Sequence, residues 1–556
     1  MPLGERIGNC PAEASSLERV RLAVLAAVGL LAFVWRLDLS LLEGTEGLYA
    51  GIAREMVQSG NYVALTYQGE PYVNKPPLFF WILALSTALF GDNEVALRLP
   101  GALCSLGTMA LTYIMGRQLF SRTAAFWGAL VVASSEVMLW YGPRVLIDST
   151  ITFLITLALL AWAQASLLGR SPRWYLLSFL AMALGSMVKE LHGFALPALV
   201  MIAHAAVRRD SRMFREPFFW GGLLASVALM GGYFWLLGSG FSQHFHPGKI
   251  AQSVVPGGTL GAIVKSRPLY GYLDIMWFSF FPWSALIPSA LVLLLAGGSL
   301  RERPRELFVV LWVVGLFIVM SLAQVKREPY LMPILPGLGL LLGSYCQVVL
   351  SSAKDPPGGL LLRVLLGLLA LVYGATLFLG PAWLQRKWFV PADVFPFWFI
   401  LAVMACCSWL LYSVVRAHLR AALSAIGAVG LSLVVAIVLI FLPAMDGEFS
   451  PRRVAAQIKA LAANGEEPVF LYAPGWPHNE DVIYYLTSEP ALPEVETVDA
   501  LEELASRLGA VTIVTDRPFL EGLSRQTGMA ITIQREFKQP RKKNLLLVSV
   551  SPPPAN

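Results

Sequence analysis

The residues best suited to chemistry lie between the first two long apolar runs of the chain, in residues 43–97. This segment carries Glu46 and Tyr49, followed by Tyr72 and by Lys75, which directly precedes two prolines. The prolines restrict the backbone beside Lys75 and disfavour a helical setting for it. A simple membrane anchor needs no acid, base and aromatic rings at this place. We therefore expect the segment to form part of an active site.

Further charged side chains stand at the ends of later apolar runs. Asp148 opens one run shortly after Arg144, and Lys189 closes another. A helix cap, worth about 0.3–1 kcal/mol, would explain Asp148 without any chemistry, and a lysine at headgroup level can simply snorkel. Several cations on one membrane face nevertheless favour an anionic ligand such as a phosphate or diphosphate. The expected phosphate-binding residues are Lys75, Arg144, Lys189 and Lys326.

The elements that position these residues are membrane helices. The chain has 556 residues, of which 56% are hydrophobic and 14% charged, against roughly a quarter charged in soluble domains. Its continuous apolar runs of about 20 residues match helices that cross a hydrocarbon core of about 30 Å. We expect a polytopic α-helical membrane protein with about 13 transmembrane helices. The expected spans are residues 20–39, 96–116, 123–141, 147–168, 174–188, 192–207, 217–238, 272–298, 307–323, 331–350, 361–383, 394–415 and 421–443.

The apolar stretch 76–91 is short and begins with two prolines, so we place it as an in-plane helix within a first outer loop, residues 40–95. With that choice, alternate loops are short and basic, and the positive-inside rule makes them cytoplasmic. The candidate residues then face the extracytoplasmic (periplasmic) side of a plasma (inner) membrane. The basic loop residues are Arg117, Arg122, Arg170, Arg173, Arg208, Arg209, Arg212, Arg215, Arg301, Arg303, Arg305, Lys354, Arg416 and Arg420.

The composition changes after residue 446. We expect a transmembrane domain over 1–446, which carries the candidate active site, and a small extracytoplasmic α/β domain over 447–556, because strand-like and helix-like runs alternate there. The strand-like runs are 469–472, 511–514 and 545–548, and the helix-like runs are 452–463 and 498–508. The five cysteines show no metal-type spacing, so we expect neither a disulfide framework nor a zinc site. No basic tract of the kind that binds nucleic acid is present.

Taken together, these motifs resemble the bacterial C-type lipid-linked-sugar glycosyltransferases, which include the aminoarabinose transferases of lipid A and the protein O-mannosyltransferases. The likeness spans about residues 20–350 in consistent order. It rests on segments 45–56, 74–81, 144–148, 184–189, 267–283 and 326–336. It implies a polyprenyl-phosphate sugar donor, an outer-face cavity and an in-plane helix after Lys75-Pro-Pro. It also implies that Glu46 lies in the acidic catalytic patch of the first loop with Asp148 as the second acidic residue, that Lys75 and Lys189 hold the donor phosphate, and that Tyr330 lines the cavity.

The sequence departs from the family pattern at several positions. Thr45 stands where the family commonly has aspartate, and Leu48 where an arginine often precedes the tyrosine. The Lys-Gly-Pro pattern is replaced by Lys189-Glu190-Leu191-His192. The expected cavity-lining residues are Tyr49, Tyr72, Tyr330, His244 and His246, the two histidines standing in for a motif of a later loop. A divalent metal ion is left open as a cofactor.

We expect transfer of one sugar, with inversion, from the polyprenyl-phosphate donor to an extracytoplasmic acceptor. The lysines would neutralise the leaving phosphate, and Glu46 or Asp148 would act as general base. Lipid A, lipopolysaccharide or a related envelope glycolipid is the favoured acceptor, and protein O-mannosyltransferase-like action on Ser/Thr is the alternative. From other classes, a transporter would need ionisable groups near the midplane and inverted repeats, and a scaffold would leave the charged residues freely replaceable.

Overall fold

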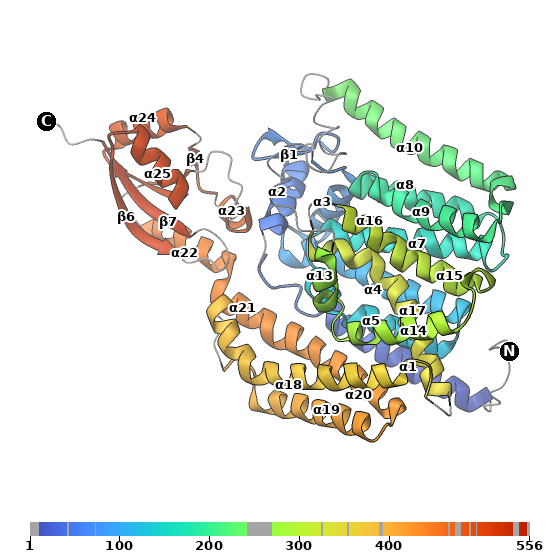
Figure 1. Ribbon diagram of the computed structural model, residues 1–556. Helices are drawn as coiled ribbons and strands as arrows, with labels where there is room; N and C mark the ends of the chain where they lie inside the picture. Colours follow the sequence, from blue (N-terminus) through green and yellow to red (C-terminus); the bar gives the residue numbers. More distant parts are fainter. Residues whose placement is uncertain are drawn as a thin grey trace.

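The computed structural model describes residues 11–41, 44–72, 74–241, 270–323, 326–352, 355–388, 393–464, 468–472, 480–488, 491–495, 497–537 and 544–552. Most of them are helical, and the long helices lie side by side in one body with a small sheet beyond one end (Figure 1). The apolar runs form helices because a membrane offers backbone N–H and C=O groups no other partner than the helix itself.

Seven helices in the described part of the chain are long and apolar enough to cross a membrane, or eight if a bent pair is counted as one span. They are α4 (Glu94–Leu119), α7 (Ile147–Ser166), α15 to α16 (Pro304–Leu322), η6 with α17 (Glu328–Ser351), the first part of α18 (Gly359–Trp388), α19 (Phe397–Val415) and the run from α20 (Leu419–Val434) to Ala463. The protein is thus a multi-pass membrane protein. The expected number of thirteen spans stays a prediction.

Two expected spans are interrupted in the structure. The range 123–141 breaks at Ser135, whose extended backbone ends α5 (Arg122–Ser134) and begins α6 (Glu136–Tyr141). The range 272–298 forms α13 (Gly271–Ser279) and a second helical stretch, Trp283–Ala296, bent by 112° relative to it. Three other expected spans are short apolar helices, with a marginal length for crossing. These are α8 (Trp174–Lys189), α9 (His192–Arg208) and the described apolar part of α10 (Pro217–Phe241).

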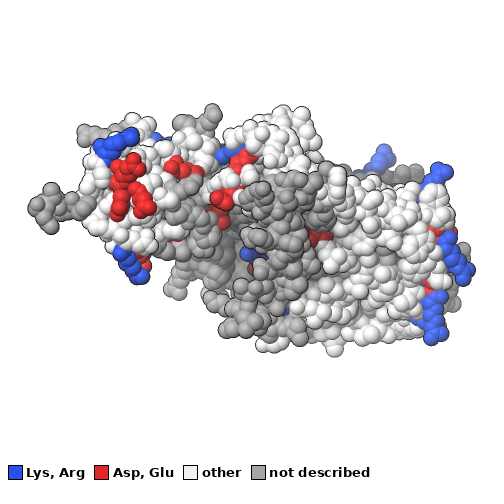
Figure 2. All heavy atoms as spheres, turned by 90° about the horizontal axis from the view of Figure 1, so that it is seen from above, with Lys and Arg blue, Asp and Glu red and all other residues white. Residues whose placement is uncertain are grey.

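The core of the helical body lies where α4, α5, α7 and α17 meet, with α8 packed on α7. In the apolar stretch of α7, 89% of the residues are buried inside the protein, whereas in that of α19 only 22% are buried. Helix α7 is therefore central and α19 peripheral. Figure 2 shows a broad uncharged surface between two charged ends, with Lys and Arg side chains gathered at the end far from the sheet. Such an uncharged belt is the surface expected to face lipid.

The segment between the first helix, α1 (Pro11–Gly29), and α4 folds into two short helices and a hairpin. Helix α2 (Gly44–Ser59) is followed by strands β1 (Thr66–Tyr67) and β2 (Glu70–Pro71) and then by α3 (Leu78–Phe90). Gln68 and Gly69 both have positive φ, as a tight two-residue hairpin requires. Glu55 of α2 accepts a hydrogen bond from Thr66 Oγ1 at 2.8 Å and another from the backbone N–H of Gln68, which fixes the hairpin to the helix.

The C-terminal residues form a five-stranded sheet of order β4-β3-β5-β7-β6. β3 (Val469–Tyr472) pairs in parallel with β4 (Glu494–Val495) and β5 (Val511–Asp516), and β7 (Leu545–Ser551) pairs antiparallel with β5 and β6 (Ala530–Phe537). Helices α22 (Pro451–Asn464), α23 (Glu480–Leu486), α24 (Val498–Leu508) and α25 (Arg517–Gln526) accompany it. The helical run from Leu419 to Ala463 passes through the expected boundary at 446/447, which stays a prediction.

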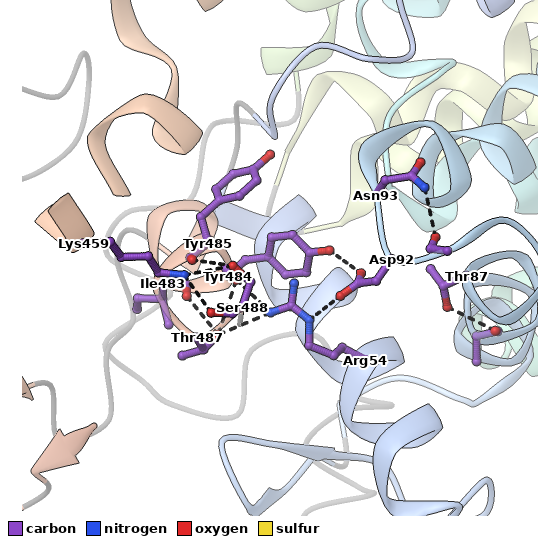
Figure 3. A network of polar contacts seen from close by, with 12 residues as sticks. Arg54, Thr87, Asp92, Asn93, Lys459, Ile483, Tyr484, Tyr485, Thr487 and Ser488 are labelled. Atoms are coloured by element: carbon purple, nitrogen blue, oxygen red, sulfur yellow. Dashed lines mark hydrogen bonds and ion pairs between the residues drawn. The ribbon is translucent and has the colours of Figure 1, made fainter. Parts of the chain in front are cut away.

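The C-terminal unit docks on the first loop through α23, which lies against α2. The two backbones approach so closely that a Cβ added to Gly47 would lie 2.2 Å from the carbonyl oxygen of Glu480. Arg54 of α2 binds Asp92 at 2.6 Å and donates to the carbonyl oxygen of Tyr484 at 2.7 Å, with the Tyr484 ring 3.7 Å from its guanidinium carbon. Figure 3 shows this network, in which Arg54 lies between the two units.

Replacing Arg54 by alanine is expected to lower the free energy of unfolding by about 2 kcal/mol, because hydrogen bonds from a charged donor are lost from a largely buried interface. Chemical denaturation in detergent micelles measures this change. The control is Arg517→Ala, whose side chain is 60% exposed and 3.6 Å from Glu536, and which should change stability by about 0–1 kcal/mol. Equal effects of the two variants would contradict a docking role for Arg54.

Candidate functional site

Two ion pairs bring together charged residues from distant parts of the chain. Lys75 Nζ lies 2.9 Å from Glu190 Oε1, and Lys189 Nζ lies 2.8 Å from Asp148 Oδ1. Because Lys189 and Glu190 are neighbours in the sequence, the two pairs adjoin. The structure therefore places the predicted residues Lys75, Asp148 and Lys189 in one region, at the ends of helices.

The ends of three helices hold these pairs. Asp148 stands in the first turn of α7, where the helix dipole favours a carboxylate. Lys189 is the last residue of α8, and α9 begins at His192, so only two residues reverse the chain. The two helices touch near this turn, since a Cβ on Gly193 would lie 2.0 Å from the Gly185 carbonyl carbon. This tight turn fixes where Lys189 and Glu190 emerge.

Three predicted tyrosines border the ion pairs. The Tyr330 ring centre lies 4.1 Å from Lys189 Nζ, a cation–π contact. Burial raises the pKa of Tyr49 well above its ordinary value, and Tyr72 and Asp148 raise it further. Burial also raises the pKa of Tyr72, against a hydrogen bond with Tyr49 that lowers it. Both phenols therefore stay protonated at neutral pH. We define the candidate site by these residues: Tyr49, Tyr72, Lys75, Asp148, Lys189, Glu190 and Tyr330.

Glu46 has surroundings that differ from those expected of a catalytic base. Its side chain is 0% exposed and forms a two-point ion pair with Arg98, at 3.1 Å from Nε to Oε1 and 3.2 Å from Nη2 to Oε2. The backbone N–H of Val145 also donates to Oε1 at 3.1 Å. Arg98 in turn donates to the carbonyl oxygens of Leu39 and Ser40. Glu46 thus joins α2, α4 and the segment before α7.

The other predicted residues lie around this region or outside the described chain. The Arg144 guanidinium carbon is 4.2 Å from the Trp140 ring centre, and Arg144 is buried. Lys326 Nζ donates to the carbonyl oxygen of Ala323 at 2.7 Å and lies 5.8 Å from the Tyr272 ring centre. His244 and His246 fall outside the described residues.

In the part of the chain that the structure describes, no group of three or more His, Cys, Asp or Glu side chains lies close enough together to bind a metal ion. No described residue is therefore assigned to the divalent metal ion left open by the sequence. A hollow of about 230 Å³ lies away from the candidate site, between α7, α8 and α9, and Tyr175, His204 and Arg212 are among its lining residues.

Two residues to which sequence reasoning gave no site role are connected by the structure to the predicted ones. Glu190 pairs with Lys75 although 115 positions separate them, and Arg98 pairs with Glu46 across 52 positions. The sequence feature that could have indicated Glu190 is its position directly after Lys189, where the family pattern Lys-Gly-Pro has a glycine. For Arg98 it was a lone cation at the mouth of an apolar helix.

Comparisons with known proteins point to glycosyltransferases. Residues 74–235, which include most of the candidate site, match the family model of dolichyl-phosphate-mannose-protein mannosyltransferase. The chain is 30% identical over 343 residues to the undecaprenyl phosphate-alpha-4-amino-4-deoxy-L-arabinose arabinosyl transferase of Pseudomonas aeruginosa strain LESB58, covering 59% of this chain and 60% of that protein. It is 28% identical over 447 residues to the corresponding transferase 1 of Pseudomonas fluorescens strain Pf-5, covering 75% and 76%.

This chain spans only a little more than half of the length of most of the similar curated proteins. The structural likeness extends further. The crystal structure of ArnT from Cupriavidus metallidurans bound to undecaprenyl phosphate superposes with a TM-score of 0.71 at 20% identity, covering 96% of this chain and 98% of that one.

The chain therefore has the fold of the ArnT crystal structure, with the apolar helices of a multi-pass membrane protein. The chain is similar to the C-type lipid-linked-sugar glycosyltransferases, which include the aminoarabinose and protein mannosyl transferases.

Proposed function

We propose that this protein transfers a sugar from a polyprenyl-phosphate donor to an acceptor nucleophile outside the cytoplasm. The observation that carries the proposal is the adjoining pair of lysines, Lys75 and Lys189, each held by one carboxylate at the end of a membrane helix. The curated relatives support it, since several are named as transferases of undecaprenyl phosphate-linked aminoarabinose.

The proposed reaction is a direct displacement at the anomeric carbon of the sugar. The acceptor oxygen forms the new bond while the carbon–oxygen bond to the phosphate breaks, and polyprenyl phosphate leaves with the bonding electrons. Lys75 and Lys189 stabilise the charge that develops on the leaving phosphate. Asp148 holds Lys189 in position, and Tyr330 covers the same ammonium group. Arg144 and Lys326 would add positive potential from the flanking segments.

We propose a structural role for Glu46 in place of the catalytic role expected from the sequence. Its two oxygens are sealed from solvent and occupied by Arg98 and by a backbone N–H. A general base must come within hydrogen-bond reach of the proton that it removes. A carboxylate enclosed in this way would first have to leave a buried ion pair.

We place the reaction on the extracytoplasmic face, because the end that carries the sheet lies opposite the end where Lys and Arg gather (Figure 2). The first loop, which contributes Tyr49, Tyr72 and Lys75 to the candidate site, contacts the C-terminal unit through α2 and α23. A reporter fused after Asn556 and found in the cytoplasm would reverse this orientation. A lipid acceptor, lipid A or a related envelope glycolipid, is the finer proposal. Mass spectrometry of envelope lipids from wild-type and deletion strains tests it, and unchanged glycolipids would exclude it.

Lys75→Met is expected to weaken the binding of undecaprenyl phosphate about 10- to 100-fold, because a charge-assisted hydrogen bond contributes about 1.5–3 kcal/mol. Equilibrium binding to the purified protein in lipid nanodiscs measures this change. Lys459→Met is the control, since Lys459 is part-buried at the C-terminal unit and bonds to Ser488. Unaltered affinity in Lys75→Met would refute the phosphate role of this lysine.

A further inference from the structure

Among Glu46, Asp148 and Glu190, the three carboxylates that pair with Arg98, Lys189 and Lys75, Glu190 is the most exposed. Its side chain is 17% exposed, against 8% for Asp148 and 0% for Glu46. Its partner Lys75 is 27% exposed, so this ion pair forms the open side of the site. The second oxygen of Glu190 lies 4.0 Å from Nδ1 of His192 and is not engaged by a lysine.

The backbone of Glu190 is strained. Its φ of +39° and ψ of −133° belong to a region that glycine enters freely and other residues avoid. The two-residue turn between α8 and α9 imposes this conformation. A glycine would adopt the same backbone conformation with less conformational strain. Because the chain has a glutamate here instead, we look for a function of its side chain.

The two other carboxylates are committed to structural partners. Glu46 accepts hydrogen bonds from Arg98 and Val145, and Asp148 holds Lys189. The partner of Glu190 is Lys75, the lysine that we assign to the donor phosphate. A phosphate arriving at Lys75 would compete directly with Glu190 for the ammonium group.

We propose that Glu190 is the carboxylate that accepts the proton of the acceptor, and that donor binding frees it by drawing Lys75 onto the phosphate. This inference rests on the proposed function and deepens it. As the acceptor hydroxyl oxygen bonds to the anomeric carbon, its proton passes to Glu190. The carbon–oxygen bond to the phosphate breaks, and its electron pair leaves on polyprenyl phosphate, which is held by Lys75 and Lys189. The carboxylic acid then returns the proton to solvent.

Glu190→Gln separates this role from a structural one. The amide keeps the size of the side chain, cannot accept the proton and no longer competes as an anion for Lys75. Turnover should fall about 10²- to 10⁴-fold, as expected for loss of a general base. Affinity for undecaprenyl phosphate should equal or exceed that of the wild type. Turnover is measured as undecaprenyl phosphate released from its sugar-charged form in reconstituted vesicles.

Glu190→Gly provides a second test that does not depend on the amide. It removes both the carboxylate and the backbone strain, so the thermal unfolding midpoint should stay equal or rise while turnover is lost. The control is Glu70→Gln on strand β2, an exposed glutamate of the first outer loop, which should keep wild-type turnover and affinity.

Turnover kept in Glu190→Gln or Glu190→Gly would overturn the role of Glu190 and leave the proposed function standing. Turnover lost together with weaker undecaprenyl phosphate binding would also overturn it, because that is the result of a merely structural residue. A wild-type protein that binds undecaprenyl phosphate but releases none from the charged donor would overturn the proposed function itself, and this assignment with it.

Discussion

Replacing Arg98 by methionine is expected to lower the free energy of unfolding by about 3–5 kcal/mol, because it leaves the carboxylate of Glu46 charged and buried without its partner. Both side chains are nearly inaccessible, at 6% and 0% exposed. The guanidinium also satisfies two backbone carbonyls of the segment before α2, at Leu39 and Ser40. The variant therefore removes one charge and four hydrogen bonds from the same place.

Equilibrium unfolding in mixed detergent micelles measures this loss. The control is Arg170→Met, an arginine that is exposed at another loop. The double variant Glu46→Gln with Arg98→Met should recover part of the stability, since no unpaired charge is left. A loss below about 1 kcal/mol in Arg98→Met would be the size of a surface ion pair and would contradict the structural role of Glu46.

Replacing Lys189 by methionine is expected to lower turnover about 10²- to 10³-fold, the usual effect of removing one preorganised group that stabilises developing negative charge. Lys189 is 11% exposed and lies between Asp148 and the Tyr330 ring. Its charge is therefore held in place before substrate arrives and needs little reorganisation during the reaction.

Release of polyprenyl phosphate from the charged donor measures the effect. Asp148→Asn should also lower turnover, and by less, because the lysine keeps its charge and loses only its anchor. Adding Asp148→Asn to Lys189→Met should then cost little more, since the two residues act as one unit. If the fold losses in turnover of the two single variants multiplied in the double variant, Asp148 would act independently of Lys189, which would contradict its positioning role.

The helical body was largely predictable because an apolar run of about 20 residues has one stable solution in a membrane. Breaks inside such runs were harder to predict. The 112° bend between α13 and the helix that follows lies at Pro282, a residue that disfavours a continuous helix. The interruption at Ser135 has no proline or glycine to mark it in the sequence. In the C-terminal unit the buried strands β3, β5 and β7 match the predicted runs. Strands β4 and β6 were not predicted, because β6 is mostly exposed and lacks a continuous apolar run, and β4 has only two residues.

The candidate site was predictable in its residue types and less so in its pairs. Lys75, Asp148 and Lys189 were expected near one another because they stand at ends of apolar runs on one face. Which lysine meets which carboxylate depends on how the turn between α8 and α9 is oriented, and no local pattern encodes that. The sequence equally could not distinguish a sealed Glu46 from an open Glu190, because burial depends on the packing of distant segments.

We propose that Lys75 and Lys189 hold the phosphate of a lipid-linked sugar while it leaves. The most direct measurement follows a polyprenyl-phosphate donor, labelled in the sugar, in vesicles that contain the purified protein and envelope lipids. Label is expected to move from the donor to an acceptor with equal release of polyprenyl phosphate, and Lys75→Met with Lys189→Met is expected to stop both. Transfer at the wild-type rate by this double variant, or transfer only from a sugar nucleotide, would exclude this role of the lysines.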